Sequence, residues 1–167
     1  MKNRKSTILF HSLIATALVI SSCRDASIVL YEPKNQDEKE IISLLIEYQD
    51  AKNHLDVQRL LSLLHDKGEF TFACGQMVSK TKLKTLLPGL WTEIRSGNSG
   101  VIPIVHECIN GDYYKAGQLN SPQIIVENGT AEATVKYTNG FCRLPLYFSM
   151  RRENHRWMIT RTEWGQN

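Results

Sequence analysis

The sequence predicts an α+β fold in which N-terminal helices pack on one face of a curved antiparallel sheet. Two observations carry this prediction. Residues 37–91 place apolar side chains at helical spacing, whereas residues 123–164 alternate between apolar and polar side chains in four short runs. Asn-Gly pairs at 128–129 and 139–140 separate three of these runs, and such pairs favour tight hairpins because both central residues of a type I′ turn have positive φ.

The helices are expected in the first half of the chain. Apolar residues recur at spacings of three, four and seven from Asp37 to Leu55, which predicts an amphipathic helix of four to five turns. Asp56 is a good N-cap for a second helix, which the Lys67-Gly68 pair is expected to end and whose buried stripe comprises Val57, Leu60, Leu61 and Leu64.

A strand and a third helix are predicted next. Residues 69–74 alternate as a strand, with residues 77–78 as its return. Ser79 or Thr81 can cap the third helix, which runs to Trp91 and which the Pro88-Gly89 pair must bend or end. Residues 101–108 are rich in strand-forming residues apart from a proline.

The last strands have two distinct faces. Residues 142–150 alternate so that Arg143 and Tyr147 share a face opposite to the apolar set Cys142, Leu144, Leu146, Phe148 and Met150. In residues 157–164 the same rule groups Trp157, Ile159, Arg161 and Glu163 against Met158, Thr160, Thr162 and Trp164. Arg143, Tyr147 and Arg161 are therefore candidates for an exposed interface, and the alternative is an ordinary solvated sheet face.

The N-terminus has the order of an export signal. Basic residues at positions 2, 4 and 5 precede an apolar run that is short for a membrane-spanning helix, and the run ends in LVISSC at residues 18–23. This resembles the lipobox of bacterial lipoproteins, which implies a signal peptide over 1–22 and lipidation of Cys23 through its thiolate. Residues 24–36 mix charge, proline and asparagine without a helical period, so we expect a lipidated tether over 23–36 and, from the remaining length, one domain over 37–167. The alternatives are a cleaved signal with an accidental cysteine, or an uncleaved anchor helix.

Charge and cysteine content narrow the function classes. Three of the 20 basic residues and none of the 17 acidic ones lie in the signal, so the formal charge of +3 disappears after cleavage. A neutral chain without basic runs gives no indication of nucleic-acid binding. With Cys23 lipidated, Cys74, Cys108 and Cys142 remain, and one disulfide in any of three pairings or three free thiols are both open. No spacing indicates a metal or a cofactor.

The predicted order of elements resembles the nuclear transport factor 2-like family, which includes SnoaL-type polyketide cyclases and ketosteroid isomerases. The resemblance lies in this order over residues 37–164 and in phrases such as LLIEYQDAKNHLDVQRLLSLL and RWMITRTEW. It implies a cone-shaped fold with a pocket between the helices and the concave face of the sheet. Members of the family use this pocket for catalysis, ligand binding or dimerisation, so the fold does not select a function.

The candidate pocket residues are Tyr48, Trp91, His106 and Glu107. Isomerase-like catalysis needs a carboxylate base and a proton donor deep in an apolar pocket, and no position matches the family's catalytic pattern. In a strand, His106 and Cys108 would share a face, but without a third group to orient them plain packing is the stronger interpretation.

Three functional hypotheses follow. The leading one is a non-enzymatic, lipid-anchored domain of the bacterial cell envelope, on the periplasmic face or the outer membrane, that binds a partner protein or a small apolar ligand. An immunity protein or an envelope-complex subunit would be of this kind. The second is a small enzyme of the polyketide-cyclase or ketosteroid-isomerase type that uses Tyr48, His106 or Glu107. The third is a homodimer that buries the outer face of the sheet.

Overall fold

In the computed structural model, the described residues are 27–72, 76–96, 117–138 and 143–165. They form a short 3-10 helix, three α-helices and six strands. The helical elements are η1 (Ile28–Leu30), α1 (Gln36–Asn53), α2 (Val57–Leu63) and α3 (Lys80–Ser96). The strands are β1 (Leu64–Thr71), β2 (Met77–Ser79), β3 (Gln118–Glu127), β4 (Thr130–Thr138), β5 (Arg143–Glu153) and β6 (Arg156–Trp164).

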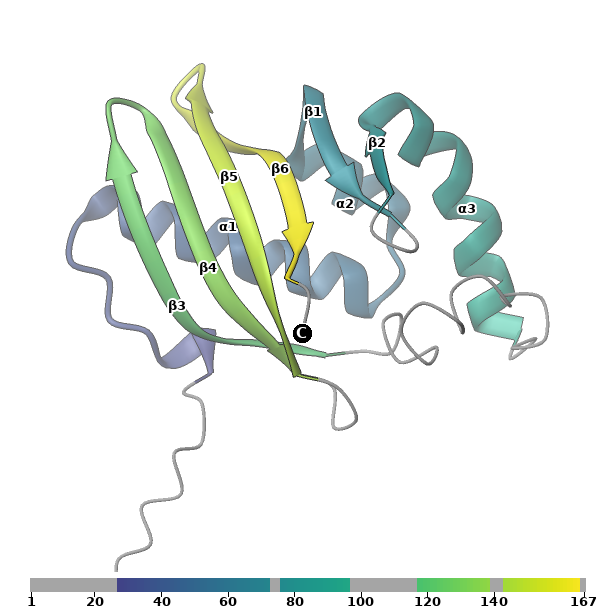
Figure 1. The fold of residues 1–167 in the computed structure, drawn as a ribbon, viewed down its shortest axis with the longest axis horizontal. Coiled ribbons are helices and arrows are strands. Elements are labelled where there is room, and N and C mark those ends of the chain that lie inside the picture. Colours follow the sequence, from purple (N-terminus) through teal and green to yellow (C-terminus); the bar gives the residue numbers. More distant parts are fainter. Residues whose placement is uncertain (1–26, 73–75, 97–116, 139–142, 166–167) are drawn as a thin grey trace, which may run out of the picture.

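The strands form one curved, open sheet in the order β2-β1-β6-β5-β4-β3 (Figure 1). Helix α1 crosses behind strands β3 to β6, while α3 flanks β1 and β2. The predicted α+β class is confirmed. The sheet is not purely antiparallel as predicted, because β1 and β6 run parallel to each other. A parallel pair requires a long connection, and here residues 72–155 lie between the two strands.

Local signals set the ends of the helices. The side chain of Asn35 accepts a hydrogen bond from the backbone N–H of Glu38 at 2.9 Å, and Asp56 caps α2 as predicted by accepting from the N–H of Arg59 at 2.9 Å. Helix α3 continues through Pro88 to Ser96, so the proline does not end it. None of the helices in the described ranges is long and apolar enough to cross a membrane.

The boundary between α2 and β1 differs from the prediction. Leu64 is buried, but it begins a strand rather than closing a helical turn, because its backbone pairs with Ile159 of β6. Gly68 lies within that strand and does not stop a helix. A Cβ at Gly68 would collide with the ring of Phe70 and the carbonyl oxygen of Thr160, which explains the glycine.

The predicted hairpins are confirmed where the structure describes them. Asn128 and Gly129 have φ values of 48° and 76° between β3 and β4. The polar link between β5 and β6 turns at Asn154 and His155, whose φ values are 50° and 63°. Both turns thus have the positive φ angles that match the twist of two antiparallel strands. The predicted turn at residues 139–140 lies outside the described residues.

The two predicted faces of β6 are wrong beyond Ile159. Ile159 pairs with Met150 of β5, and the next paired residue, Arg161, lies opposite Ser149. The residue between them is a bulge, which reverses the alternation. Trp157, Ile159 and Thr162 are therefore buried, whereas Arg161 and Glu163 are exposed. On β5 the prediction is confirmed from Leu144 to Met150, whose buried residues alternate with less buried ones.

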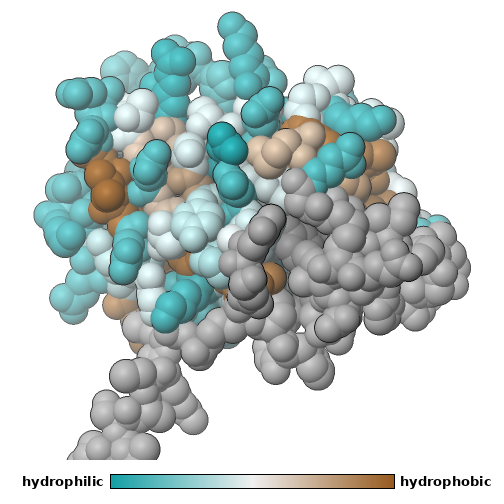
Figure 2. All heavy atoms as spheres, viewed as in Figure 1, coloured by the Kyte–Doolittle hydropathy of each residue, from teal (hydrophilic) through white to brown (hydrophobic). Residues whose placement is uncertain are grey.

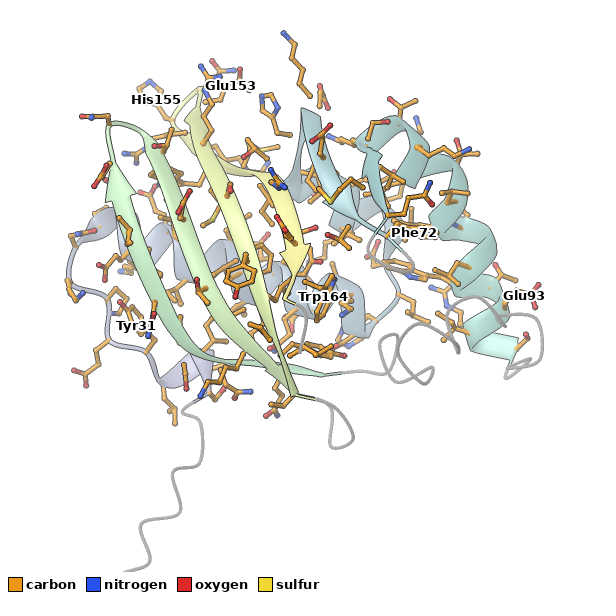
Figure 3. All side chains as sticks on the ribbon, viewed as in Figure 1. Tyr31, Phe72, Glu93, Glu153, His155 and Trp164 are labelled. Atoms are coloured by element: carbon orange, nitrogen blue, oxygen red, sulfur yellow. The ribbon has the colours of Figure 1, made fainter. Side chains whose placement is uncertain are left out.

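The segment from Ser27 to Gln36, predicted as part of the tether, packs on the domain. Ser27 forms a β-bridge with Asn120 of β3, and the side chain of Ile28 is 0 % exposed. The carboxylate of Glu38 accepts hydrogen bonds from the Tyr31 hydroxyl at 3.0 Å and from the Lys34 N–H at 2.9 Å. Figure 3 shows Tyr31 beside β3, at the edge of the sheet. The domain therefore includes at least the ten residues before Asp37.

Candidate functional site

An apolar cavity lies between the helices and the inner face of β1 and β6. It has a volume of about 50 Å³. Helices α1, α2 and α3 each contribute to its wall, and Phe72 and Trp164, at the ends of β1 and β6, close the sheet side (Figure 3). Most of the wall is aromatic or aliphatic, and it comprises Tyr48, Leu60, Leu64, Phe70, Phe72, Leu83, Leu87, Trp91 and Trp164, with Lys52, Thr71 and Thr162 as its polar members.

Tyr48 is a buried side chain in the wall of this cavity, and it carries a hydroxyl group. The residue is 9 % exposed, and its ring lies edge-on to the ring of Phe148, with centroids 5.1 Å apart. Burial raises the pKa of the Tyr48 hydroxyl, because the low dielectric disfavours the phenolate. The hydroxyl makes no hydrogen bond within the part of the chain that the structure describes. A neutral donor is therefore present at the cavity wall.

Lys52 lies one helical turn after Tyr48 on α1. Its Nζ is 4.1 Å from the centroid of the Tyr137 ring and 4.7 Å from that of the Trp164 ring. These two rings meet edge-on at 5.2 Å. The ammonium group is thus held by cation–π contacts at the boundary of the cavity, which places a positive charge beside an otherwise apolar wall.

The two threonines of the wall bind each other. The Thr71 hydroxyl donates to the carbonyl oxygen of Thr162 at 2.6 Å, and the Thr71 N–H donates to the Thr162 hydroxyl at 3.2 Å. These bonds join the parallel strands β1 and β6 where both strands approach their ends. The threonines therefore fix the wall, while the Tyr48 hydroxyl remains available to a ligand.

The structure brings two of the predicted pocket residues together. Tyr48 and Trp91 line the same cavity from α1 and α3, and Trp91 is buried. His106 and Glu107 lie outside the described residues, as do all four cysteines, including Cys23, so their predicted roles stay predictions. The part of the chain that the structure describes contains no cluster of acidic, histidine or cysteine residues suited to a metal ion.

The predicted Arg/Tyr surface lies on the opposite face of the sheet. Tyr147 and Arg161 are both exposed there, on neighbouring strands. Arg161 forms an ion pair of 2.9 Å with Glu163, which is the cross-strand partner of Tyr147. Arg143 begins β5, and its side chain lies outside the described part. This face is mostly hydrophilic (Figure 2), and carboxylates share it with the arginine.

Lys52 and Thr162 are two residues of the cavity wall that the sequence did not mark as candidates. Lys52 follows Tyr48 by four positions, which places both on one helical face, but a lysine is normally assigned to the solvated side. The alternation grouped Thr162 with Met158 and Thr160 and did not place it at a cavity, because the bulge in β6 leaves no mark in the sequence pattern. The spacing of Lys52 from Tyr48 was a usable signal, whereas the sequence held no such signal for Thr162.

No protein-family model matches the chain, and no curated protein sequence matches it. Solved structures do. An NTF2-like protein from Cytophaga hutchinsonii is 15 % identical, with a TM-score of 0.57 over 80 % of this chain and 99 % of that one. A cystatin-like protein of unknown function from Nostoc punctiforme is 13 % identical, with a TM-score of 0.56 over 80 % and 93 %.

A third structure supports the same assignment. An NTF2-like protein with a cystatin-like fold from Novosphingobium aromaticivorans is 18 % identical, with a TM-score of 0.52 over 77 % of this chain and 80 % of that one. At such low identity these structures show the fold alone. The chain has the nuclear transport factor 2-like, cystatin-like cone fold that its order of elements predicts.

Proposed function

We propose that this protein binds a small, mainly apolar ligand in its cone cavity while Cys23 anchors it to the bacterial cell envelope through a lipid. The observation that carries the binding function is Tyr48, a buried side chain that lines an apolar cavity and whose hydroxyl has no hydrogen-bond partner among the described residues. Such a donor favours a ligand with an acceptor, such as a carbonyl or ether oxygen, at its buried end.

The walls of the cavity support this ligand class. Aromatic rings from α3 and from the ends of β1 and β6 offer apolar contact area, which contributes about 25 cal/mol per Å² buried. Lys52 adds a polar group to the same wall, with its Nζ against the rings of Tyr137 and Trp164. The volume of about 50 Å³ fits the acceptor-bearing end of a ligand, so neighbouring side chains must move when a whole ring enters.

An enzyme of the polyketide-cyclase or ketosteroid-isomerase type is the second candidate. Tyr48 favours it, since a neutral tyrosine in an apolar pocket can stabilise an enolate oxygen. That chemistry also requires a base. The predicted candidates, His106 and Glu107, lie outside the described residues, whereas binding requires only the donor and the apolar wall. Binding is therefore the function that the geometry supports best.

The outer face of the sheet offers another route to a binding function. Arg143, Tyr147 and Arg161 were predicted to meet a protein partner or a second copy of the chain there. The carboxylates around Arg161 already satisfy part of its charge, so a partner would compete with the ion pair to Glu163. The cavity therefore supports ligand binding better than this face supports a protein partner.

Ligand binding can be tested with two aromatic probes of similar size. Acetophenone carries a carbonyl acceptor and ethylbenzene does not, and quenching of tryptophan fluorescence reports binding of either. We expect Tyr48→Phe to weaken acetophenone binding by about 3- to 10-fold, the effect of one neutral hydrogen bond, and to leave ethylbenzene binding unchanged. Tyr147→Phe, on the outer face, is the matched control. Equal losses for both probes, or no saturable binding to the wild type, would contradict the proposal.

Lipid attachment can be tested independently. We expect an alkynyl fatty acid fed to cells to label the wild-type protein and a Cys74→Ser control, but not Cys23→Ser, since the thiolate of Cys23 is the proposed acceptor. A Cys23→Ser protein that still carries the label would show that the anchor is elsewhere.

A further inference from the structure

The first residues that the structure describes are held on the domain. Ser27 bridges to Asn120 at the start of β3, and Ile28 is buried in the core. Glu38, on the first turn of α1, then holds Tyr31 and Lys34 through its carboxylate. The chain is thus attached to the domain from Ser27 onward, and only residues 24–26 separate that point from Cys23.

This short connection restricts how far the domain can lie from a lipid on Cys23. Four residue steps span at most about 14 Å when fully extended. A domain of this length is roughly 35 to 40 Å across, so most of its surface lies beyond that reach. Only the end of the domain that carries η1 can lie next to the lipid. Figure 1 shows this end opposite the turns at residues 128–129 and 154–155.

The surface at this end is apolar where it would meet the lipid. Val29 and Leu30 follow the buried Ile28 in η1, and they are 64 % and 73 % exposed. Four large hydrophobic residues are exposed in the described ranges, and these two are adjacent and lie within seven positions of Cys23. Together they form a small exposed apolar patch close to the proposed lipid attachment point.

We propose that Val29 and Leu30 dock into the interfacial layer of the membrane and orient the domain, with the η1 end towards the bilayer. This inference rests on the proposed lipidation of Cys23 and adds a second, non-covalent contact to it. Two signals hold a protein at a bilayer more firmly than one acyl attachment alone, and a rigid second contact also sets its orientation. The occupant of this surface is the bilayer itself, because the acyl chains keep the surface within about 14 Å of it.

The test uses the acylated full-length mature protein in nanodiscs of phosphatidylethanolamine and phosphatidylglycerol that contain a gadolinium-chelating lipid. Paramagnetic broadening of backbone amide signals measures the distance of each amide from the membrane surface. We expect the broadening to be strongest at Val29 and Leu30 and at least threefold weaker at Gly129 and Asn154. In a double variant, Val29→Ser with Leu30→Ser, we expect this gradient to fall at least twofold although acylation is retained.

Ile125→Ser is the matched control, because Ile125 is also apolar and exposed but lies farther along β3. It should keep the gradient of the wild type. Uniform broadening of the acylated wild type would overturn the docking proposal alone. Protection of residues 29 and 30 together with a dimer mass would overturn it in favour of a second copy of the chain. A mass spectrum without diacylglycerol on Cys23 would overturn both docking and anchoring.

Discussion

The substitution Ile28→Ala tests whether the segment before α1 belongs to the domain. Ile28 is 0 % exposed, and alanine removes three buried carbon atoms. At about 0.8 kcal/mol for each carbon the lost burial is about 2.4 kcal/mol, and the cavity left behind raises the expected cost to about 3 kcal/mol. For a chain of this size, such a loss lowers the melting temperature by about 6 to 12 °C. A true tether at this position would give no loss.

The assay is equilibrium unfolding in urea, followed by circular dichroism in a Cys23→Ser background that removes the lipid. Val29→Ala is the matched control, since Val29 lies in the same 3-10 turn but is 64 % exposed. It should change the free energy of unfolding by less than about 0.5 kcal/mol. If the two variants differ by less than 0.5 kcal/mol, the segment is not packed on the domain. A lower m-value for Ile28→Ala alone would instead indicate that the segment detaches before the rest unfolds.

The same assay tests three further contacts. Gly68→Ala should lower the free energy of unfolding by at least about 2 kcal/mol, because the added Cβ has no room. Gly89→Ala, in open space on α3, should raise it by about 0.5 to 1 kcal/mol. Equal effects would contradict this reasoning. The hydrogen bond from the Lys34 N–H, helped by that from Tyr31, lowers the pKa of Glu38. The ionised Glu38 carboxylate therefore stabilises the folded state above pH 4.5, and this stabilisation is lost as the pH falls further. The cost of Glu38→Gln should therefore be larger at pH 7 than at pH 3, and a pH-independent cost would refute it. Arg152→Met breaks ion pairs to two carboxylates of α1 and should lower the free energy of unfolding by about 1 kcal/mol, and by less in high salt. The control Arg151→Met, at the neighbouring position, should cost less than half of that. Equal costs would show that the ion pairs contribute nothing.

The elements that the sequence predicted correctly are those whose signals lie within a few positions. The Asp56 cap needs only the backbone N–H three residues later, and the 128–129 turn needs only two residues that tolerate positive φ. The leucine stripe of α2 needs only the helical period. For such features the local sequence carries most of the free energy that decides the structure.

The features that escaped prediction depend on distant partners. Leu64 has a side chain suited to either a helix or a strand, and its pairing with Ile159 decides the matter. The bulge in β6 arises where β6 pairs with β5, so the alternation within residues 157–164 gave the wrong faces. The segment before α1 mixes polar and apolar residues without a helical period, and the burial of Ile28 together with the bridge from Ser27 to Asn120 attaches it to β3. In each case the deciding contact lies far away in the sequence.

Helix α1 shows how far the cavity could be predicted and also supplies the last test. Its inward stripe contains Ile41, Leu45, Tyr48 and Lys52, at steps of four, three and four residues. The first two are fully buried aliphatic residues in the closed core, and the last two bring polar atoms to the cavity wall. Substitutions in the first part of this stripe should therefore affect stability, and substitutions in its last part should affect ligand binding.

We expect Tyr48→Phe to change the free energy of unfolding by less than about 1 kcal/mol, because it keeps the buried ring and removes a hydroxyl without a partner among the described residues. Leu45→Ala, one turn earlier, should cost about 2 to 5 kcal/mol, since it empties a fully buried position. Urea unfolding in the absence of ligand measures both. A Tyr48→Phe variant that loses as much stability as Leu45→Ala would mean that the hydroxyl holds the fold together, and the case for Tyr48 as a ligand contact would then fail.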